Sequence, residues 1–384
     1  MMKKKIAIVV SSPMMVNFFL ISQLNYLTHK FDVTLITGPE AQNISLEESL
    51  SKKVKVIQIH MKRKIAFFSD IRAFFQLAII FLKFKFNIVH SVSPKSGFLC
   101  QSAAFICGVN IRIHTFTGQV WVNKRGLLYW LLKSIDMLIV KMSTNILVDS
   151  YSQRAYLMSE NILDHENSSV LLNGSISGVD GSRFNQSLDN YYTFRNNNNI
   201  GKNSKIILFI GRLAKDKGIV DLIEAFNSYC GDINDSHLLL VGPDEENILE
   251  NFIDIKENPR IHYFNYTKKP EFFMKVSDIL CLPSLREGFG NVVLEAALCG
   301  IPSIVTDIYG LKDVVEKNHT ALVFKVSNVD DLGKSLANLI NNDEKRILMG
   351  SNAMKRADYL FSKQSINEAI VKFYVNLLKH NLDV

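Results

Sequence analysis

The sequence predicts an α/β protein built from two doubly wound domains. In both halves of the chain, short apolar runs rich in Val, Ile and Leu alternate with longer amphipathic segments. Such runs are typical of parallel strands buried on both faces, and the segments between them are long enough to be crossover helices. The alternation restarts after an Asn-rich stretch, and a length of 384 residues also favours two domains over one.

The first domain is expected to span residues 1–190. Its predicted strands are KIAIVV, FDVTLIT, KVKVIQI, FNIVHSV, IRIHTF and TNILVDS. The lysines before the first run resemble the start of a signal peptide, but Ser11, Ser12 and Pro13 interrupt the apolar residues that follow. We therefore expect a buried strand and its crossover helix there. No apolar run reaches the ~18 residues that a transmembrane helix needs.

The second domain is expected to span residues 200–360. Its predicted strands are IILFIG, HLLLVGP, RIHYFN, DILCLPS and PSIVTD. The polar stretch FRNNNNIGKNSK, residues 194–205, is the expected interdomain linker, and residues 361–384 are expected to form a helix that packs back toward the first domain. Doubly wound folds bind ligands beyond the carboxyl ends of their strands, so we expect a ligand cleft between the domains.

Charge and cysteine usage narrow the possible partners. The five cysteines form no CxxC pair, which gives no sign of a disulfide framework or a zinc site and fits a reducing cytosol. Residues 1–190 carry 21 Lys and Arg against 12 Asp and Glu. Within them, residues 62–87 interleave cations with phenylalanines, a pattern that fits an anionic membrane face and equally a core-facing helix with a charged rim. No nucleic-acid-binding motif accompanies the charge.

The loop after the first strand of the second domain carries two cations. The strand IILFI ends at Gly211, Arg212 and Lys217 follow, and Gly218 opens a helix in the sequence GRLAKDKG. A guanidinium and an ammonium at a strand-to-helix turn make a good clamp for a diphosphate. Such residues are also common on loop surfaces, and the GK[ST] of a Walker loop is missing.

A second strand-to-helix turn places two glutamates eight residues apart in EGFGNVVLE. Gly288 and Gly290 allow a tight turn, and the amides at the start of the following helix are expected to face a ligand. Glu287 in the loop and Glu295 on the helix can both accept hydrogen bonds from sugar hydroxyls. Either glutamate alone is also consistent with simple stabilisation of the helix start.

These motifs resemble those of a known enzyme family. EGFGNVVLE resembles the E-x7-E motif of the retaining nucleotide-sugar glycosyltransferases of family 4, which have the GT-B fold of two Rossmann-like domains facing across a deep cleft. GRLAKDKG resembles the phosphate clamp of that family, and LLNGSISGVDGSRF resembles its domain junction. HSVSPKSGFL and RIHTFTGQVW are most similar to bacterial capsule and O-antigen hexosyltransferases that extend lipid-linked saccharides.

The resemblance implies a role for each motif residue. Arg212 and Lys217, next to Gly211, would hold the diphosphate, Glu295 the ribose, and Glu287 the donor sugar. The amides that would contact the same sugar belong to Gly288, Phe289, Gly290, Asn291 and Val292. Fixed cations and helix amides would neutralise the leaving group, and the absence of a D-x-D sequence agrees with a transferase that uses no metal and no other cofactor.

The chain departs from the family pattern on the acceptor side. The loop after the first strand reads SSPMMVNFF in place of a glycine-rich turn, and Thr117 precedes Gly118 where many relatives have a histidine. His114 and His90 are the histidines close to the predicted strand ends. His114 is included among the catalytic candidates, with His90 and Thr117 as alternatives, although a core position is the commoner meaning of a single histidine.

The predicted function is transfer of a hexose or N-acetylhexosamine from a nucleoside-diphosphate sugar, with UDP as the expected nucleotide. The expected acceptor is a saccharide on undecaprenyl diphosphate, in bacterial surface polysaccharide synthesis. The enzyme would then be cytoplasmic, peripherally bound to the inner face of the cytoplasmic membrane, and would bind no nucleic acid. The alternatives are a GT-B nucleotide-sugar epimerase or hydrolase, and a non-catalytic sugar-binding subunit.

Overall fold

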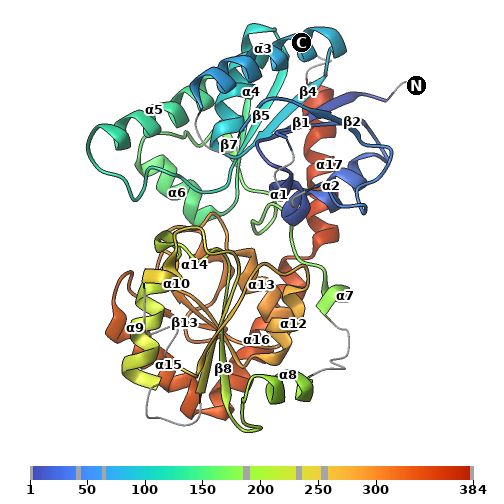
Figure 1. Ribbon diagram of the computed structural model, residues 1–384. Coiled ribbons are helices and arrows are strands. Elements are labelled where there is room, and N and C mark those ends of the chain that lie inside the picture. Colours follow the sequence, from blue (N-terminus) through green and yellow to red (C-terminus); the bar gives the residue numbers. More distant parts are fainter. Residues whose placement is uncertain are drawn as a thin grey trace. The chain divides into compact units, whose positions relative to one another are not determined.

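The computed structural model describes residues 3–39, 45–62, 66–184, 191–230, 236–251 and 258–380. The chain divides into two compact units. The N-terminal unit comprises Met1–Gly178 together with Lys363–Val384, and the C-terminal unit comprises Val179–Ser362. Each unit is built around one parallel sheet (Figure 1).

The sheet of the N-terminal unit has seven strands in the order β3-β2-β1-β4-β5-β6-β7. All of its pairings are parallel, and in register Ile6 of β1 lies between Val33 of β2 and Ile88 of β4. The strands are β1 (Lys5–Val10), β2 (Asp32–Thr37), β3 (Lys55–Gln58), β4 (Ile88–Val92), β5 (Ile111–Phe116), β6 (Asn145–Val148) and β7 (Ser168–Ser169).

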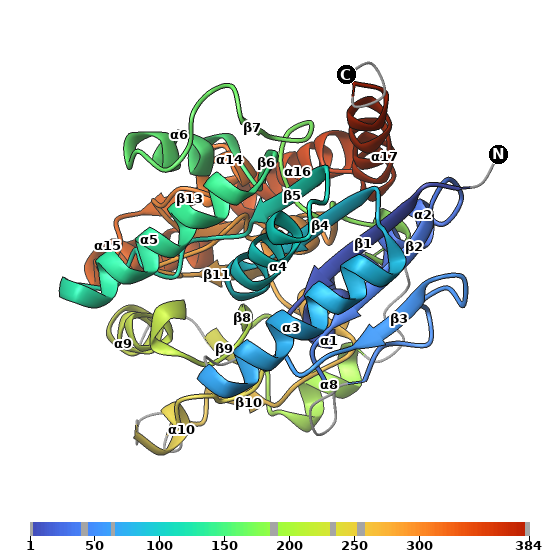
Figure 2. The ribbon, with the colours of Figure 1, turned by 90° about the horizontal axis from the view of Figure 1, so that it is seen from above.

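Helices cover both faces of this sheet because the side chains after Lys5 in its central strand β1 are all apolar and point alternately to the two faces. In β1, Ala7 and Val9 join the core beneath α3 (Phe67–Phe84) and α4 (Pro94–Ile106), with α5 (Gly126–Met142) beside α4. The alternate residues Ile6 and Ile8 join the core on the other face. That face is covered by α1 (Pro13–Met15), η1 (Val16–Leu20), α2 (Ile21–Leu27) and α17 (Lys363–His380). Figure 2 shows α3, α4 and α5 side by side. Helix α6 (Tyr151–Ser159) follows β6.

The sheet of the C-terminal unit has six parallel strands in the order β10-β9-β8-β11-β12-β13. They are β8 (Lys205–Ile210), β9 (Ser236–Val241), β10 (Ile261–Phe264), β11 (Ile279–Leu282), β12 (Ser303–Thr306) and β13 (Ala321–Phe324). The helices are α7 (Gly181–Phe184), α8 (Tyr191–Asn197), η2 (Lys215–Lys217), α9 (Ile219–Cys230), α10 (Ile248–Asn251), α12 (Pro270–Val276), α13 (Asn291–Leu298), α14 (Leu311–Val314), α15 (Val329–Asn341) and α16 (Asp343–Leu360).

Apart from the additional edge strand β7, both sheets have the same strand order, which indicates where a ligand is expected. In each sheet the first strand lies in the middle, the next two strands extend to one side, and the later strands extend to the other. The order therefore reverses between β1 and β4 in one sheet and between β8 and β11 in the other. In doubly wound sheets this reversal opens a crevice beyond the carboxyl ends of the strands, where ligands bind.

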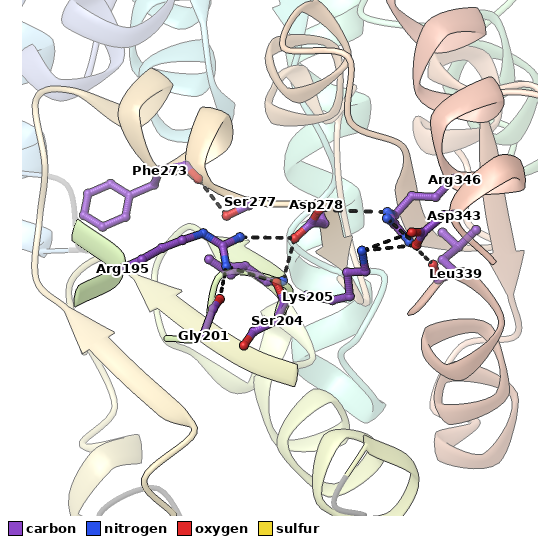
Figure 3. A network of polar contacts seen from close by, with 11 residues as sticks. Arg195, Gly201, Ser204, Lys205, Phe273, Ser277, Asp278, Leu339, Asp343 and Arg346 are labelled. Carbon is purple, nitrogen blue, oxygen red and sulfur yellow. Dashed lines mark hydrogen bonds and ion pairs between the residues drawn. The ribbon is translucent and has the colours of Figure 1, made fainter. Parts of the chain in front are cut away.

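The Asn-rich stretch expected as the interdomain linker lies inside the C-terminal unit. The unit begins at Val179, whose amide bonds the carbonyl of Phe361, not near residue 200. Arg195 is 4% exposed and donates hydrogen bonds to the carbonyls of Gly201 and Ser204, 2.7 and 3.1 Å away. Its guanidinium also lies 3.8 Å from Asp278, so the stretch is anchored to the sheet (Figure 3). The asparagine content predicts a loop, but the buried side chain of Arg195 fixes the stretch to the C-terminal unit.

The C-terminal helix returns to the N-terminal unit. Ile370 and Tyr374 of α17 are buried in the same core as the strands β1 and β2, and α17 packs against α2. Of the strands expected from the sequence, each is present; β7 and β13 are additional. No helix within the described residues is long and apolar enough to cross a membrane.

Candidate functional site

The loops after β8 and β11 are held together where the strand order reverses. Gly218 ends η2 with φ +68°, and a Cβ atom there would lie 2.0 Å from the carbonyl oxygen of Pro283. Only glycine permits this approach. The amide of Leu285 donates to the carbonyl of Asp216, 3.0 Å away, and joins the two loops a second time.

Lys217 and Glu287, one from each predicted motif, form an ion pair across these loops. The Lys217 Nζ lies 2.6 Å from the Glu287 Oε1, and both side chains are less than one-fifth exposed. The hydroxyl of Ser284 donates to the same carboxylate oxygen at 2.8 Å. Thr306 in turn donates to the carbonyl of Ser284 at 2.5 Å. The carboxylate of Glu287 is therefore held in one orientation by two donors.

Arg212 lies beside this pair and is surrounded by carboxylates. Its guanidinium donates to Glu245 at 2.8 Å and lies 3.5 Å from Asp216. Burial lowers the pKa of Arg212, but the hydrogen bond that it donates to Glu245 and the charges of Asp216, Glu245 and Glu287 outweigh burial and raise the pKa above its ordinary value. Arg212 is therefore a permanent cation next to Glu287.

The other glutamate and the turn before α13 occupy different surroundings. Glu295 lies partly exposed on α13, and its charge helps burial to raise the pKa of the Cys299 thiol to about 12. Gly290 precedes the helix with φ +72° and packs against Leu311. Phe289 is 3% exposed and its ring lies tilted against that of Phe361, with the ring centroids 5.4 Å apart, so its side chain belongs to the core. The sugar and ribose contacts expected of these residues stay predictions.

Four residues of the cluster were not singled out from the sequence: Asp216, Glu245, Ser284 and Arg286. Asp216 accepts from both Arg212 and Arg286, 3.5 and 3.4 Å away. Glu245 follows β9, which is the direct neighbour of β8, so the parallel pairing brings its side chain to Arg212. The signal was present in the sequence, because the acidic run DEEN follows the strand HLLLV after a single Gly-Pro pair.

His114 and His90 lie inside the N-terminal unit on opposite faces of its sheet. His114 is 0% exposed, its Nδ1 lies 2.8 Å from the hydroxyl of Ser91, and its ring packs against Gly97. His90 is 3% exposed and lies 2.5 Å from the hydroxyl of Tyr374. Burial lowers the pKa of each imidazole to about 3, so both rings are neutral. The catalytic role of His114 stays a prediction, and its surroundings are those of a core residue.

A buried polar group lies at the carboxyl ends of β5 and β6. Asp149 is 5% exposed, and burial raises the pKa of its carboxyl group to about 8. The side chain of Gln153 accepts a hydrogen bond from the backbone amide of Asp149 and donates one to the side chain of Gln119, each 3.2 Å long. Within the described part of the chain, Asp149 Oδ1 and Gln119 Nε2 have no hydrogen-bond partner. Buried polar atoms in folded proteins normally bond to protein, water or a ligand.

The described residues include no group of three or more His, Cys, Asp or Glu side chains that could hold a metal ion. A cavity of about 360 Å³ lies at the amino ends of β1, β4 and β5, lined in part by Lys4, Asn87 and Asn110. Within the N-terminal unit, this cavity therefore lies at the opposite end of the strands from Asp149 and Gln119.

Sequence comparison places both units in families of sugar-transferring enzymes. Residues 5–150 match the family described as glycosyl transferase 4-like, and residues 191–356 match glycosyl transferases group 1. The chain is 30% identical over 326 residues to the capsular polysaccharide biosynthesis glycosyltransferase CapM of Staphylococcus aureus, covering 84% of this chain and 85% of that protein. It is 25% identical to the UDP-Gal:α-D-GlcNAc-diphosphoundecaprenol α-1,3-galactosyltransferase of Escherichia coli, covering 86% and 87% of the two chains.

Solved structures share the fold. Sucrose-phosphate synthase from Thermosynechococcus elongatus superposes with a TM-score of 0.83 at 17% identity, covering 98% of this chain and all of the other. Anabaena HepE in complex with UDP-glucose has a TM-score of 0.79 at 16% identity, with 97% and 99% covered. The sequence matches, together with the shared fold, show that this chain belongs to the family 4 glycosyltransferases of the GT-B fold.

Proposed function

We propose that this protein transfers a hexose or N-acetylhexosamine from a UDP-sugar to a saccharide on undecaprenyl diphosphate, with retention at the anomeric carbon. The observation that carries the proposal is the meeting of Arg212, Lys217 and Glu287 where the sheet reverses its strand order. Two comparisons support the choice of substrates. The E. coli relative is named for UDP-galactose and a diphosphoundecaprenol acceptor, and the HepE structure contains UDP-glucose.

The donor diphosphate exchanges places with carboxylates. Lys217 is paired with Glu287 and Arg212 with Glu245, so both cations are held in position at the reversal point. A diphosphate gives Arg212 two oxygens for its planar fork and gives Lys217 a compact charge partner. When the bond from sugar to phosphate breaks, negative charge grows on the leaving nucleotide, and fixed cations stabilise it most at that point.

Glu287 is released by the same exchange. Once Lys217 turns to the diphosphate, the Glu287 carboxylate can accept hydrogen bonds from sugar hydroxyls while Ser284 keeps it oriented. Glu295 binds the ribose hydroxyls, and amides of residues 288–292 contact the sugar. Phe289 contributes its amide alone, because its side chain is buried against Phe361.

The acceptor is bound by the N-terminal unit. Asp149 and Gln119 support this assignment, because each offers a buried polar atom without a partner at the carboxyl edge of the sheet. With a pKa near 8, Asp149 is largely protonated at neutral pH and can donate a hydrogen bond as well as accept one. An acceptor on undecaprenyl diphosphate makes the enzyme a cytoplasmic protein, peripherally bound to the inner face of the cytoplasmic membrane.

A panel of UDP- and GDP-sugars offered with a lipid-linked acceptor extract tests the proposal. Mass analysis should find the acceptor heavier by one sugar with a UDP-sugar donor. Free sugar formed equally without acceptor would instead indicate a hydrolase, and an isomerised donor would indicate an epimerase. Donor left intact under all conditions would leave only the non-catalytic sugar-binding role.

A further inference from the structure

The outer side of α3 carries large apolar side chains where a helix in water carries polar ones. One stripe at helical spacing is between 43% and 71% exposed and consists of Phe67, Ile71, Phe75, Ile79 and Leu82. The opposite stripe is buried in the core and includes Ala73, Leu77 and Phe81. Burial against the sheet therefore explains only one side of α3, since a helix that is apolar all round is normally covered.

The same pattern continues over the neighbouring helices. Leu127, Trp130, Leu131 and Leu138 on α5 are between 45% and 85% exposed. Helix α4 packs against both α3 and α5, and its last turn exposes Phe105 and Ile106 at 54% and 71%. Figure 2 shows the three helices side by side over one face of the sheet. We call these exposed residues of α3, α4 and α5 the helical face.

The exposed charges on and beside these three helices are positive, because the acidic side chains of the helices are paired or buried. Asp70 and Asp136 are their acidic residues. Asp70 is paired with Lys95 at 2.6 Å, and Asp136 is 1% exposed and accepts the indole N–H of Trp121 at 2.8 Å. Exposed cations lie on the helices or next to them: Lys62, Arg72, Lys83, Lys85, Lys124, Arg125 and Lys141.

We propose that the helical face inserts into the interfacial region of an anionic lipid bilayer. Large exposed apolar side chains gathered on three neighbouring helices mark an interaction surface, because a protein that meets only water seldom carries so many together. A bilayer supplies both an apolar layer for the side chains and negative headgroups for the surrounding cations, and an indole such as that of Trp130 suits the interface. A second copy of the chain fits less well, because its helical face would bring the same cations into contact with these.

This inference deepens the proposed function. It rests on that function only in one respect, because a lipid-linked acceptor is the reason for the protein to bind a membrane. It differs from the sequence-based expectation in the residues that bind the membrane. The expectation concerned residues 62–87, of which Arg63 and Lys64 lie outside the described residues. The structure adds α5 and the end of α4, so that apolar insertion should contribute more than the charges.

Sedimentation of the full chain with lipid vesicles tests the helical face. The vesicles contain equal parts of phosphatidylcholine and phosphatidylglycerol, or phosphatidylcholine alone. An α5 variant, Leu127→Gln with Trp130→Ser and Leu131→Gln, should partition about tenfold or more weakly into the anionic vesicles, because three exposed apolar side chains are removed. An α3 variant, Phe75→Ser with Ile79→Gln, should weaken partitioning in the same direction. High salt should weaken parental binding without abolishing it.

The matched control changes three equally exposed apolar residues of α16. Ile347→Gln, Leu348→Gln and Tyr359→Ser replace side chains that are 62% to 86% exposed, and this variant should partition like the parent. Parental adsorption by the α3 and α5 variants would overturn the proposal. So would a parental dimer that the α5 variant dissociates, with no adsorption to vesicles, since the occupant would then be a second copy.

Transfer to acceptor dispersed in detergent separates this inference from the proposed function. The α5 variant should keep transfer in detergent while losing it on vesicles, because its donor site is untouched. Transfer by the parent without vesicle adsorption would refute the docking face alone. Adsorption without transfer to any acceptor would refute the proposed function and leave the docking face standing.

Discussion

Helices α3, α4 and α5 of the N-terminal unit follow the same order along the chain as α12, α13 and α14 of the C-terminal unit, yet only the first set exposes large apolar side chains. Each set lies among strands of equivalent order in its sheet. All three helices of the second set are fully described, and none of the exposed large apolar residues lies on them. Helix α16 packs against α13. The fold thus determines which side of a helix packs on the sheet, whereas the residues on the outer side depend on whether that side contacts water or a partner.

The reversal points of the two sheets differ as well. Between β8 and β11, Lys217 is paired with Glu287 and Arg212 lies beside them. At the equivalent place between β1 and β4, the hydroxyls of Ser11 and Ser93 lie 3.5 Å apart. One topology therefore presents fixed charge in one unit, suited to a diphosphate, and neutral hydroxyls in the other.

The largest expected effect comes from removing the cation at the charged reversal point. Lys217→Ala should lower kcat/KM by ~10²-fold or more, because in the proposed reaction the ammonium stabilises the charge on the leaving diphosphate. Steady-state kinetics with donor and lipid-linked acceptor measures the change. Lys215→Ala is the matched control, since Lys215 belongs to the same short helix but is exposed, and it should keep parental rates. Equal rates for the two variants would remove Lys217 from the mechanism.

The two glutamates sharpen the comparison within the charged unit. Glu295→Ala should weaken binding of free UDP about tenfold, because the proposed ribose hydrogen bonds are present without the sugar. Glu287→Ala should lower kcat and leave UDP affinity close to parental, because its proposed partner is the sugar. Calorimetry with UDP and turnover kinetics separate the two effects. The reverse pattern would mean that the roles are exchanged.

The buried histidines distinguish a structural from a catalytic role in the N-terminal unit. His90 and His114 have folded-state pKa values of about 3 against an ordinary 6.5. The unfolded chain therefore binds more protons between these values, and each histidine lowers the free energy of unfolding by ~1.4 kcal/mol per pH unit as the pH falls from 6.5 toward 3. His114→Gln should lose less stability than the parent on acidification, as measured by denaturant unfolding at several pH values.

Two buried acids act in the opposite direction. Burial raises the pKa of Asp136 to about 7, against a smaller lowering by Trp121, and raises that of Asp149 to about 8. The stability that these two carboxyl groups contribute is lost as the pH rises from about 4 to those values. The effect of the His114 imidazole is therefore measured as the difference between His114→Gln and the parent at each pH. If His114 is catalytic, His114→Gln should instead lose kcat at pH 7. At that pH the imidazole no longer lowers the free energy of unfolding, so a loss of kcat would not reflect the titration of His114.

The smallest expected effect concerns metal. Because Arg212 and Lys217 are proposed to supply the positive charge for the diphosphate, prolonged EDTA treatment should leave the transfer rate within error of the untreated enzyme. Loss of activity that Mg²⁺ or Mn²⁺ restores would contradict this design.

Much of the fold follows from local pattern. Strands such as β1 and β8 are continuous apolar runs bounded by polar residues, so each was predictable from a few neighbouring residues. Strand β7 consists of Ser168 and Ser169 and carries no such signal. The linker assignment was wrong because composition cannot reveal that Arg195 is buried against Gly201, Ser204 and Asp278.

The candidate site was predictable only in part, for a similar reason. Arg212, Lys217 and Glu287 stand in motifs that short stretches of sequence reveal. Glu245 reaches Arg212 only because β9 pairs with β8, and that pairing is a property of the whole sheet. The orientation of Glu287 likewise depends on Ser284, whose role appears once the loop is folded.

Titration of UDP into the full chain tests the central claim, that charge at the reversal point of the C-terminal sheet binds the donor diphosphate. The experiment compares the parent, Lys217→Ala and Lys215→Ala by calorimetry. We predict that UDP binds the parent and Lys215→Ala alike, and that Lys217→Ala loses about tenfold or more in affinity, because a charge-assisted pair with phosphate is missing. Equal affinity for UDP in all three proteins would contradict the account.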